Sequence, residues 1–251
     1  MKKYGFTGET KEFCGRTLRR IVALKDFGNV KKGDVGGWIE TEENLSQEGS
    51  AWVYGSAIVC DSATVGGSAW VGDSATVYGS ATVGGSAWVC DSATVYGLAT
   101  VCDSARVCGS ATVGGSAWVG DSATVCGSAT VGGSAWVCDS ATVGDSATVG
   151  GSATVGDSAT VGGSETVRGS AMVRSNTDYV VIGPLGSRDG YTTFFKDNSG
   201  EITVTCGCFL GTIDEFRKKV VETHGTSKFA KEYLAAADLA EIHMNIKEDT
   251  K

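Results

Sequence analysis

Residues 71–89 read VGDSATVYGSATVGGSAWV, and this six-residue pattern continues without a break on both sides. Valine occupies every sixth position from Val53 to Val173, which gives twenty-one valines in one register. Alanine precedes each valine by two residues, with Glu165 as the single exception. A period of six differs from that of an α-helix, whose apolar positions recur every three or four residues. The pattern therefore predicts short strands separated by regular turns.

Each six-residue unit has one apolar side. Alanine and valine are two residues apart and point to the same side of a strand, whereas the intervening threonine or tryptophan points to the other. Gly-Gly or Gly-Asp then supplies a turn, where positive φ is tolerated. So short a strand buries its apolar side only by stacking on copies of itself. Three strands per coil predict about seven triangular coils over residues 49–174, or roughly 33 Å of rod at about 4.8 Å per coil.

The unit of an aliphatic residue, Gly, two variable residues and a small residue resembles that of the hexapeptide-repeat superfamily. The resemblance covers residues 49–174 and implies a left-handed parallel β-helix, whose handedness the periodicity alone does not give. The segment DFGNVKKGDVGGWIE at residues 26–40, which leads into the repeats, is similar to segments of uncharacterised hexapeptide-repeat proteins of bacteria and their phages. Those proteins are often labelled transferases, a label that implies no established reaction.

The flanks lack the repeat. We expect residues 1–48 to form an N-terminal capping segment, with a strand at Arg16–Leu24 and with Val35, Trp38 and Ile39 closing the open coil, because a solenoid end exposes apolar side chains and strand edges. Residues 175–251 predict a small α+β unit. Its predicted strands are Tyr179–Ile182, Tyr191–Phe195 and Ile202–Cys206, followed by a helix that starts at the capping box of Thr212 and Glu215 and by a second helix from about Ser227.

Composition excludes several classes of function. The net charge is −8, and the segments 1–48, 49–174 and 175–251 carry about +1, −6 and −3. Nucleic-acid binding needs a positive stripe, which is missing; basic residues such as Arg16 are expected on a solvated face. No apolar run suits a signal peptide or a membrane span, which predicts a cytoplasmic protein with no membrane partner. Nine cysteines without a framework spacing indicate reduced thiols.

Catalytic residues are not evident. The resemblance implies acyltransferases that use a histidine general base near a subunit interface, usually helped by a loop excursion. Residues 49–174 contain neither a histidine nor an insertion, and His224 and His243 lie in the predicted helical segment. Cys206 and Cys208 could contribute to a metal site, but one such pair is no zinc signature and buried strand-end cysteines are favoured. We therefore predict no catalytic residue, no metal ligand and no cofactor.

Three faces of the prism follow from sorting the residues before each valine by eighteen. The first carries Trp52, Trp70 and Trp88, and the third carries Trp118 and Trp136. The second carries a column of threonines that resembles the flat lattices of ice-binding β-helices: Thr76, Thr94, Thr112, Thr130, Thr148 and Thr166. Exposed tryptophans could also dock a protein or a sugar. In the C-terminal segment, Arg217, Lys218 and Lys219 are further candidates for an interaction surface.

An internal duplication weighs against a selected face. Residues 66–95 and 114–143 differ only at Tyr78 and Cys126, and their offset of 48 is no multiple of eighteen. The copy therefore moves its outward residues to another face while the core is unchanged. We predict a non-enzymatic structural protein with a rigid spacer, whose partners bind the terminal segments, above all the C-terminal one. An acyltransferase-like enzyme, an ice-binding protein and a homo-oligomer such as a trimer are the alternatives.

Overall fold

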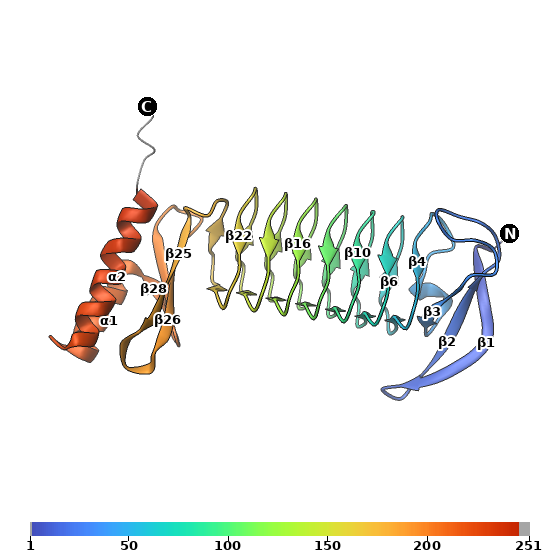
Figure 1. Cartoon of the computed structure of the whole chain (residues 1–251), viewed down its shortest axis with the longest axis horizontal. Helices are drawn as coiled ribbons and strands as arrows, with labels where there is room; N and C mark the ends of the chain where they lie inside the picture. Colours follow the sequence, from blue (N-terminus) through green and yellow to red (C-terminus); the bar gives the residue numbers. More distant parts are fainter. Residues whose placement is uncertain (1, 246–251) are drawn as a thin grey trace, which may run out of the picture.

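The computed structural model describes residues 2–245 and shows a rod with a folded unit at each end (Figure 1). Met1 and residues 246–251, which belong to the two predicted terminal segments, lie outside the described residues. The rod is a parallel β-solenoid of about eight turns, so the mainly β fold predicted from the repeat is confirmed. Within the described part, every helix is too short or too polar to cross a lipid bilayer.

The rod consists of two-residue strands, each of which ends on a repeat valine. The first face contains β4 (Trp52–Val53), β7 (Trp70–Val71), β10 (Trp88–Val89), β13 (Arg106–Val107), β16 (Thr124–Val125), β19 (Thr142–Val143) and β22 (Thr160–Val161). The second contains β5 (Ile58–Val59), β8 (Thr76–Val77), β11 (Thr94–Val95), β14 (Thr112–Val113), β17 (Thr130–Val131), β20 (Thr148–Val149) and β23 (Thr166–Val167). The third contains β6 (Thr64–Val65), β9 (Thr82–Val83), β12 (Thr100–Val101), β15 (Trp118–Val119), β18 (Trp136–Val137), β21 (Thr154–Val155) and β24 (Met172–Val173).

Each strand pairs in parallel with the strand eighteen residues away. Val89, for example, lies between Val71 and Val107, and the backbone N–H of Trp88 donates to the Ala105 carbonyl at 2.9 Å. Nearly all the repeat valines and alanines are completely buried. The eighteen-residue coil and the three predicted columns of outward side chains are therefore confirmed.

The corners need a left-handed backbone at their second residue, which is Gly or Asp. Asp73 has φ of 56° and Gly79 has φ of 73°. At one corner, four aspartates follow one another along the rod: Asp103, Asp121, Asp139 and Asp157. Each of the first three accepts the backbone N–H of the next through its Oδ2, at 3.4, 3.3 and 3.1 Å. These carboxylates thus add a hydrogen bond between successive coils.

The solenoid begins earlier than the repeat. Strand β3 (Val35–Ile39) pairs in parallel with β5, and Leu45 forms a parallel bridge to Val65, which adds most of a coil above the seven predicted ones. The repeat pattern misses this coil because it carries Gly36 and Gly37 where later coils carry serine and alanine. A Cβ at Gly36 would lie 2.5 Å from the Val53 carbonyl oxygen, so this segment packs too closely for a side chain.

The N-terminal cap continues the second face. Strands β1 (Tyr4–Phe13) and β2 (Arg16–Ala23) add to β3 as antiparallel strands, and a 3-10 turn, η1 (Glu42–Asn44), follows β3. Of the residues predicted to close the coil, Ile39 is buried in the rod core. The prediction is wrong for Val35, which is half exposed, and for Trp38, which packs against a separate outer cluster. Three residues that the pattern did not indicate extend the rod core into the cap: Tyr4, Ile21 and Val30.

The C-terminal unit covers the other end of the rod (Figure 1). Its antiparallel sheet consists of β25 (Tyr179–Leu185), β26 (Gly190–Lys196), β27 (Ile202–Cys206) and β28 (Phe209–Thr212), with a 3-10 turn, η2 (Gly186–Arg188), after β25. Helices α1 (Ile213–His224) and α2 (Lys228–Asn245) pack on the sheet, and the predicted capping box at Thr212 is present.

Strand β26 is buried on both of its sides. Phe195 is completely buried and joins the core of the rod, whereas Phe194, also completely buried, joins the core formed with the helices. The sheet is therefore a shared wall between two cores. Phe195 closes the apolar interior at the C-terminal end of the rod, much as Tyr4 does at the N-terminal end.

Replacing Phe195 by alanine should lower the free energy of unfolding by about 3–5 kcal/mol, because a large buried ring is lost and a cavity opens at the end of the rod. The control is Tyr191→Ala on the same strand, where 55% of the residue is exposed and a change below about 1 kcal/mol is expected. Urea unfolding followed by circular dichroism measures both variants. Equal losses in the two would contradict the role of Phe195 as an end plug.

Candidate functional site

Trp52 does not belong to an exposed surface. Only 2% of it is accessible, and its ring packs edge-on against Phe27 at 5.4 Å and Tyr4 at 6.3 Å between ring centroids. The expectation of a three-tryptophan surface is therefore wrong at its first member, because the N-terminal cap covers it. The repeat pattern alone could not place the cap over this coil.

The other tryptophans form ladders along the rod. The rings of Trp70 and Trp88 stack at 5.9 Å with an interplanar angle of 20°, and the Arg106 guanidinium lies 5.7 Å from the Trp88 ring centre. Trp118 and Trp136 lie 5.1 Å apart on the third face. The Trp88 ring has Trp70 and the Arg106 guanidinium of the same chain as neighbours, so it is poorly placed to stack on a sugar. Packing between coils accounts for both ladders.

The threonine column lies in one register on the second face, from Thr76 through Thr94, Thr112, Thr130 and Thr148 to Thr166. The end of the column nearest the N-terminal cap is bordered by the tip of the β1–β2 hairpin. Thr76 and Thr94 line a depression there together with Phe13, Cys14 and Tyr78. Ice binding through this column stays a prediction that the geometry does not decide.

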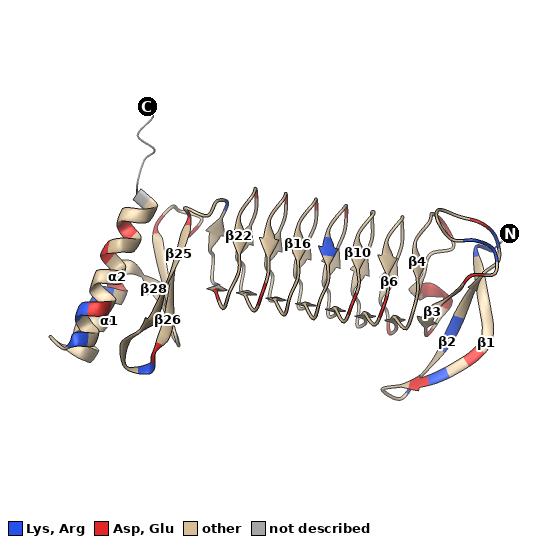
Figure 2. Ribbon diagram, in the orientation of Figure 1, with Lys and Arg blue, Asp and Glu red and all other residues tan. Residues whose placement is uncertain are grey.

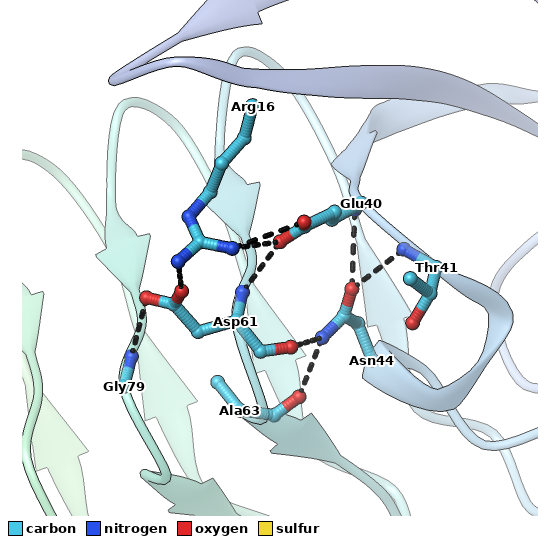
Figure 3. Close-up of polar contacts among 7 residues, drawn as sticks. All are labelled: Arg16, Glu40, Thr41, Asn44, Asp61, Ala63 and Gly79. Atoms are coloured by element: carbon cyan, nitrogen blue, oxygen red, sulfur yellow. Dashed lines mark hydrogen bonds and ion pairs between the residues drawn. The ribbon is translucent and has the colours of Figure 1, made fainter.

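A polar cluster joins the cap to the first regular coil (Figure 3). Asn44, of which 1% is exposed, uses all of its hydrogen-bonding capacity: Oδ1 accepts from the backbone N–H groups of Glu40 (3.1 Å) and Thr41 (2.8 Å), and Nδ2 donates to the carbonyls of Asp61 (3.0 Å) and Ala63 (2.9 Å). One side chain thus ties the end of β3 to the corner that follows β5.

Arg16 binds two carboxylates in this cluster (Figure 3). Its Nη1 donates to both oxygens of Glu40 at 3.0 and 3.2 Å, and its Nη2 pairs with Asp61. Glu40 also accepts the backbone N–H of Asp61 at 2.8 Å, and Asp61 accepts that of Gly79 at 3.1 Å. The Arg16 side chain is 41% exposed, in line with the expected solvated face, but its ion pairs to two carboxylates were not predicted.

The cluster of Arg16, Glu40, Asn44 and Asp61 holds the cap to the rod, and we call it the clasp. Both carboxylates accept hydrogen bonds from Arg16 and from the backbone, so neither is free to act as a general base. Sequence analysis missed Glu40, Asn44 and Asp61 because they are polar residues of unremarkable type that folding brings next to Arg16. The sequence gives one local indication of the cluster: Asn44 is an uncharged amide that follows the acidic segment 40–43.

Lys3 is the one buried cation among residues 2–48. It is 1% exposed, and its Nζ donates to the carbonyls of Ala51 at 2.9 Å and Glu48 at 3.3 Å and lies 5.2 Å from the Phe27 ring centre. Burial, reinforced by the charge of Lys25, lowers the pKa of Lys3 to about 8. A lysine with such a pKa can act as a nucleophile, but substrate cannot reach this one beneath the cap. Its role is to satisfy carbonyls at the end of the rod.

Among the described residues, His224, His243 and Cys206 each contact a neighbouring side chain or carbonyl group. The ring of His224 stacks on Tyr233 at 5.6 Å, and His243 Nε2 lies 3.4 Å from the Asn176 carbonyl oxygen. Cys206 Sγ accepts a hydrogen bond from Thr192 at 3.3 Å, and Cys208 is exposed. Among residues 2–245, neither cysteine belongs to a group of three converging metal donors.

The basic residues of α1 divide into two kinds. Arg217 donates to Glu241 at 2.7 and 2.9 Å and to Asp238 at 2.7 Å, and so holds α1 against α2. The part of Arg217 in an interaction surface stays a prediction. Lys218 and Lys219 are exposed, and Lys219 lies 3.7 Å from Glu222. Figure 2 shows basic residues mainly at the two ends of the molecule and acidic residues along the corners of the rod.

A groove of about 480 Å³ lies where the last coil meets the C-terminal sheet. Thr166 and Arg168 line it from the rod, and Tyr191, Cys208 and Leu210 line it from the sheet. Tyr191 and Leu210 are 55% and 54% exposed and lie together in this groove. Sequence analysis placed Tyr191 in a predicted strand, and nothing in the sequence distinguished Leu210 from a core leucine.

The chain shares a short stretch of sequence with a known protein. No family model matches the sequence. A stretch of 62 residues is 39% identical to a protein of Escherichia coli K12 named uncharacterized acetyltransferase YdcK. The match covers 22% of this chain and 19% of that protein, so the chain spans about a fifth of the length of the curated relative it matches. The β-solenoid and this match are consistent with hexapeptide-repeat, transferase-like proteins.

Replacing Asn44 by alanine should lower the free energy of unfolding by about 2–3 kcal/mol, because buried carbonyl and N–H groups lose their partners. The control is Glu43→Ala in the same 3-10 turn, where an exposed side chain is removed and a change within about 0.5 kcal/mol is expected. Denaturant titration of both variants measures the difference. An Asn44 variant as stable as the Glu43 variant would show that the clasp contributes nothing.

Proposed function

We propose that this chain is a non-enzymatic structural protein whose rod is a rigid spacer that holds two terminal units at a fixed separation and orientation. The observation that carries the proposal is an unbroken ladder of coils in one register, closed by an apolar plug at each end. Every coil is bonded to the next by backbone hydrogen bonds along three faces. Such a stack bends little because each strand is fixed on both sides.

The rod offers little for covalent chemistry. Residues 49–174 lack histidine, and the six-residue spacing leaves no loop excursion that could build an acyl-donor site. Burial and neighbouring aspartates raise the pKa of Cys90 to about 11 and of Cys102 and Cys138 to about 12. These thiols stay protonated near neutral pH, and a protonated thiol is a weak nucleophile.

The same proposal assigns partner binding to the C-terminal unit. The groove between the rod and the sheet combines the exposed Tyr191 and Leu210 with Arg168, and large amphipathic and cationic side chains of this kind are common at protein interfaces. Self-association, for which a trimer is one alternative from the sequence, would use Trp88 and Trp136, which are 43% and 53% exposed.

A spacer can be shortened by whole coils. Removal of residues 139–156 joins Cys138 to Asp157 and keeps the repeat in register. Spin labels are placed on Cys14 and Cys208, the two exposed cysteines, after replacement of the other seven. Pulsed electron resonance should give a narrow distance distribution in the full chain and a distribution that is equally narrow but about 4.8 Å shorter after the deletion.

Two outcomes would contradict the spacer. A broad distribution in the full chain would show that the ends are not fixed, and an unchanged distance after the deletion would show that the coils do not set their separation. Circular dichroism of both labelled proteins confirms that each is folded before the comparison.

Acyl transfer is the second candidate, and the match to the protein named as an acetyltransferase favours it. Titration of the full chain with acetyl-CoA, followed by calorimetry, distinguishes the two. The structural proposal expects no saturable heat, with coenzyme A and ATP as controls for binding through phosphate groups alone. Saturable binding of acetyl-CoA, without comparable binding of coenzyme A or ATP, would contradict the structural proposal and support acyl transfer.

A further inference from the structure

Three cysteines lie one above another along one corner of the rod. Cys90, Cys108 and Cys126 each follow a repeat valine, and those valines pair directly, Val89 with Val107 and Val107 with Val125. The backbone N–H groups of the cysteines donate to the next coil at 3.0, 2.9 and 2.9 Å. Because the register is exact from coil to coil, successive cysteines are about 4.8 Å apart.

Two carboxylates converge on Cys90, the member of this thiol column nearest the N-terminal cap. The donor atoms of Asp73, Cys90 and Asp91 all lie within 4.8 Å of one another. Cys90 Sγ is 3.8 Å from Asp91 Oδ2, and that oxygen accepts the backbone N–H of Gly109, the residue after Cys108, at 2.9 Å. The Asp91 carboxylate thus lies between the coil of Cys90 and the coil of Cys108.

The stacking suits a metal ion better than a disulfide. A disulfide brings two Cβ atoms to about 3.5–4.5 Å. Residues stacked by simple translation along the rod keep their Cβ atoms about 4.8 Å apart, so a disulfide here would have to pull two hydrogen-bonded coils together. Two thiolates on a tetrahedral ion, each about 2.3 Å from it, have sulfurs about 3.8 Å apart, which side-chain rotation alone can reach from this spacing.

We propose that this corner binds a thiophilic divalent cation of the zinc type, with the Cys90 and Cys108 sulfurs and the Asp91 and Asp73 carboxylates as its ligands. Mixed thiolate and carboxylate donors are among those that zinc accepts, and thiolates favour zinc and its heavier relative cadmium over magnesium or calcium. On binding, each thiol loses its proton to solvent and its sulfur forms the bond to the ion. Cys126 lies one coil further along and offers an additional sulfur.

Charged and polar groups surround the Cys90 thiol. Burial first, and then Asp91, Cys108 and Asp73, raise the pKa of Cys90 to about 11, while Arg106 opposes them. Tyr54, whose hydroxyl lies 3.5 Å from Asp73, faces the same corner.

The repeat itself supplies variants that keep the fold. Gly72 and Gly144 occupy this corner position in other coils, so Cys90→Gly and Cys108→Gly place a residue that the rod already accepts. The matched control is Cys138→Gly. Cys138 also precedes an aspartate, with its Sγ 3.3 Å from Asp139, but Gly120 and Gly156 occupy its position in the neighbouring coils.

The reduced full chain is titrated with Cd²⁺, and the ultraviolet absorption of sulfur-to-cadmium charge transfer is recorded; Zn²⁺ is then measured by competition with a chromophoric chelator. We expect one tightly bound ion per chain and a rise in melting temperature with Zn²⁺. Cys90→Gly should abolish the band, Cys108→Gly should weaken binding at least tenfold, and Cys138→Gly should leave both unchanged.

Three results would overturn the proposal. These are the absence of a cadmium band in the native protein, a band that survives in the Cys90→Gly, Cys108→Gly double variant, and an equal loss in the Cys138→Gly control. Circular dichroism of each variant establishes that it is folded. Asp91→Asn, which suits the left-handed backbone at this corner, should weaken Zn²⁺ binding while the thiols remain, and unchanged binding would exclude the carboxylate from the site.

Discussion

The whole molecule depends on valine and alanine side chains that stack in columns along the axis while the backbone of each coil hydrogen-bonds to the next. Neither interaction suffices alone, because one coil has an open apolar interior above and below it and unpaired strand edges on three sides. Repetition solves both problems within the rod and leaves them at its two ends. The nonrepetitive parts of the chain are where the ends are closed.

The two ends are closed in different ways. At the N-terminal end, the chain continues the second face with antiparallel strands, fills the interior with Tyr4, and satisfies edge carbonyls with Lys3. At the C-terminal end, a separate sheet lies against the rod and inserts Phe195. The first solution extends the solenoid, whereas the second covers it with a unit that has a core of its own.

The repeat could be predicted in detail because each side chain packs against residues at a fixed spacing in the sequence. The coil of eighteen residues, the threonine column and the tryptophan columns all follow from the period. Trp52 could not be placed, because its burial depends on a cap from another part of the chain. The clasp of Arg16, Glu40 and Asp61 was missed for the same reason, since its members are tens of residues apart. In β26, Phe194 and Phe195 are adjacent, point to opposite sides of the strand and are both buried. Sequence alone did not show that each belongs to a different core.

The aspartate column at one corner has a consequence for the solution conditions that favour the rod. Asp103, Asp121, Asp139 and Asp157 place four negative charges in line, about 4.8 Å from one to the next. Hydrogen bonds from the backbone N–H of Asp157 and from the Cys138 thiol lower the pKa of Asp139. The aligned carboxylates repel one another through a solvent that mobile counterions can screen. Dissolved salt should therefore stabilise this corner, in contrast to the usual weakening of surface ion pairs by rising ionic strength.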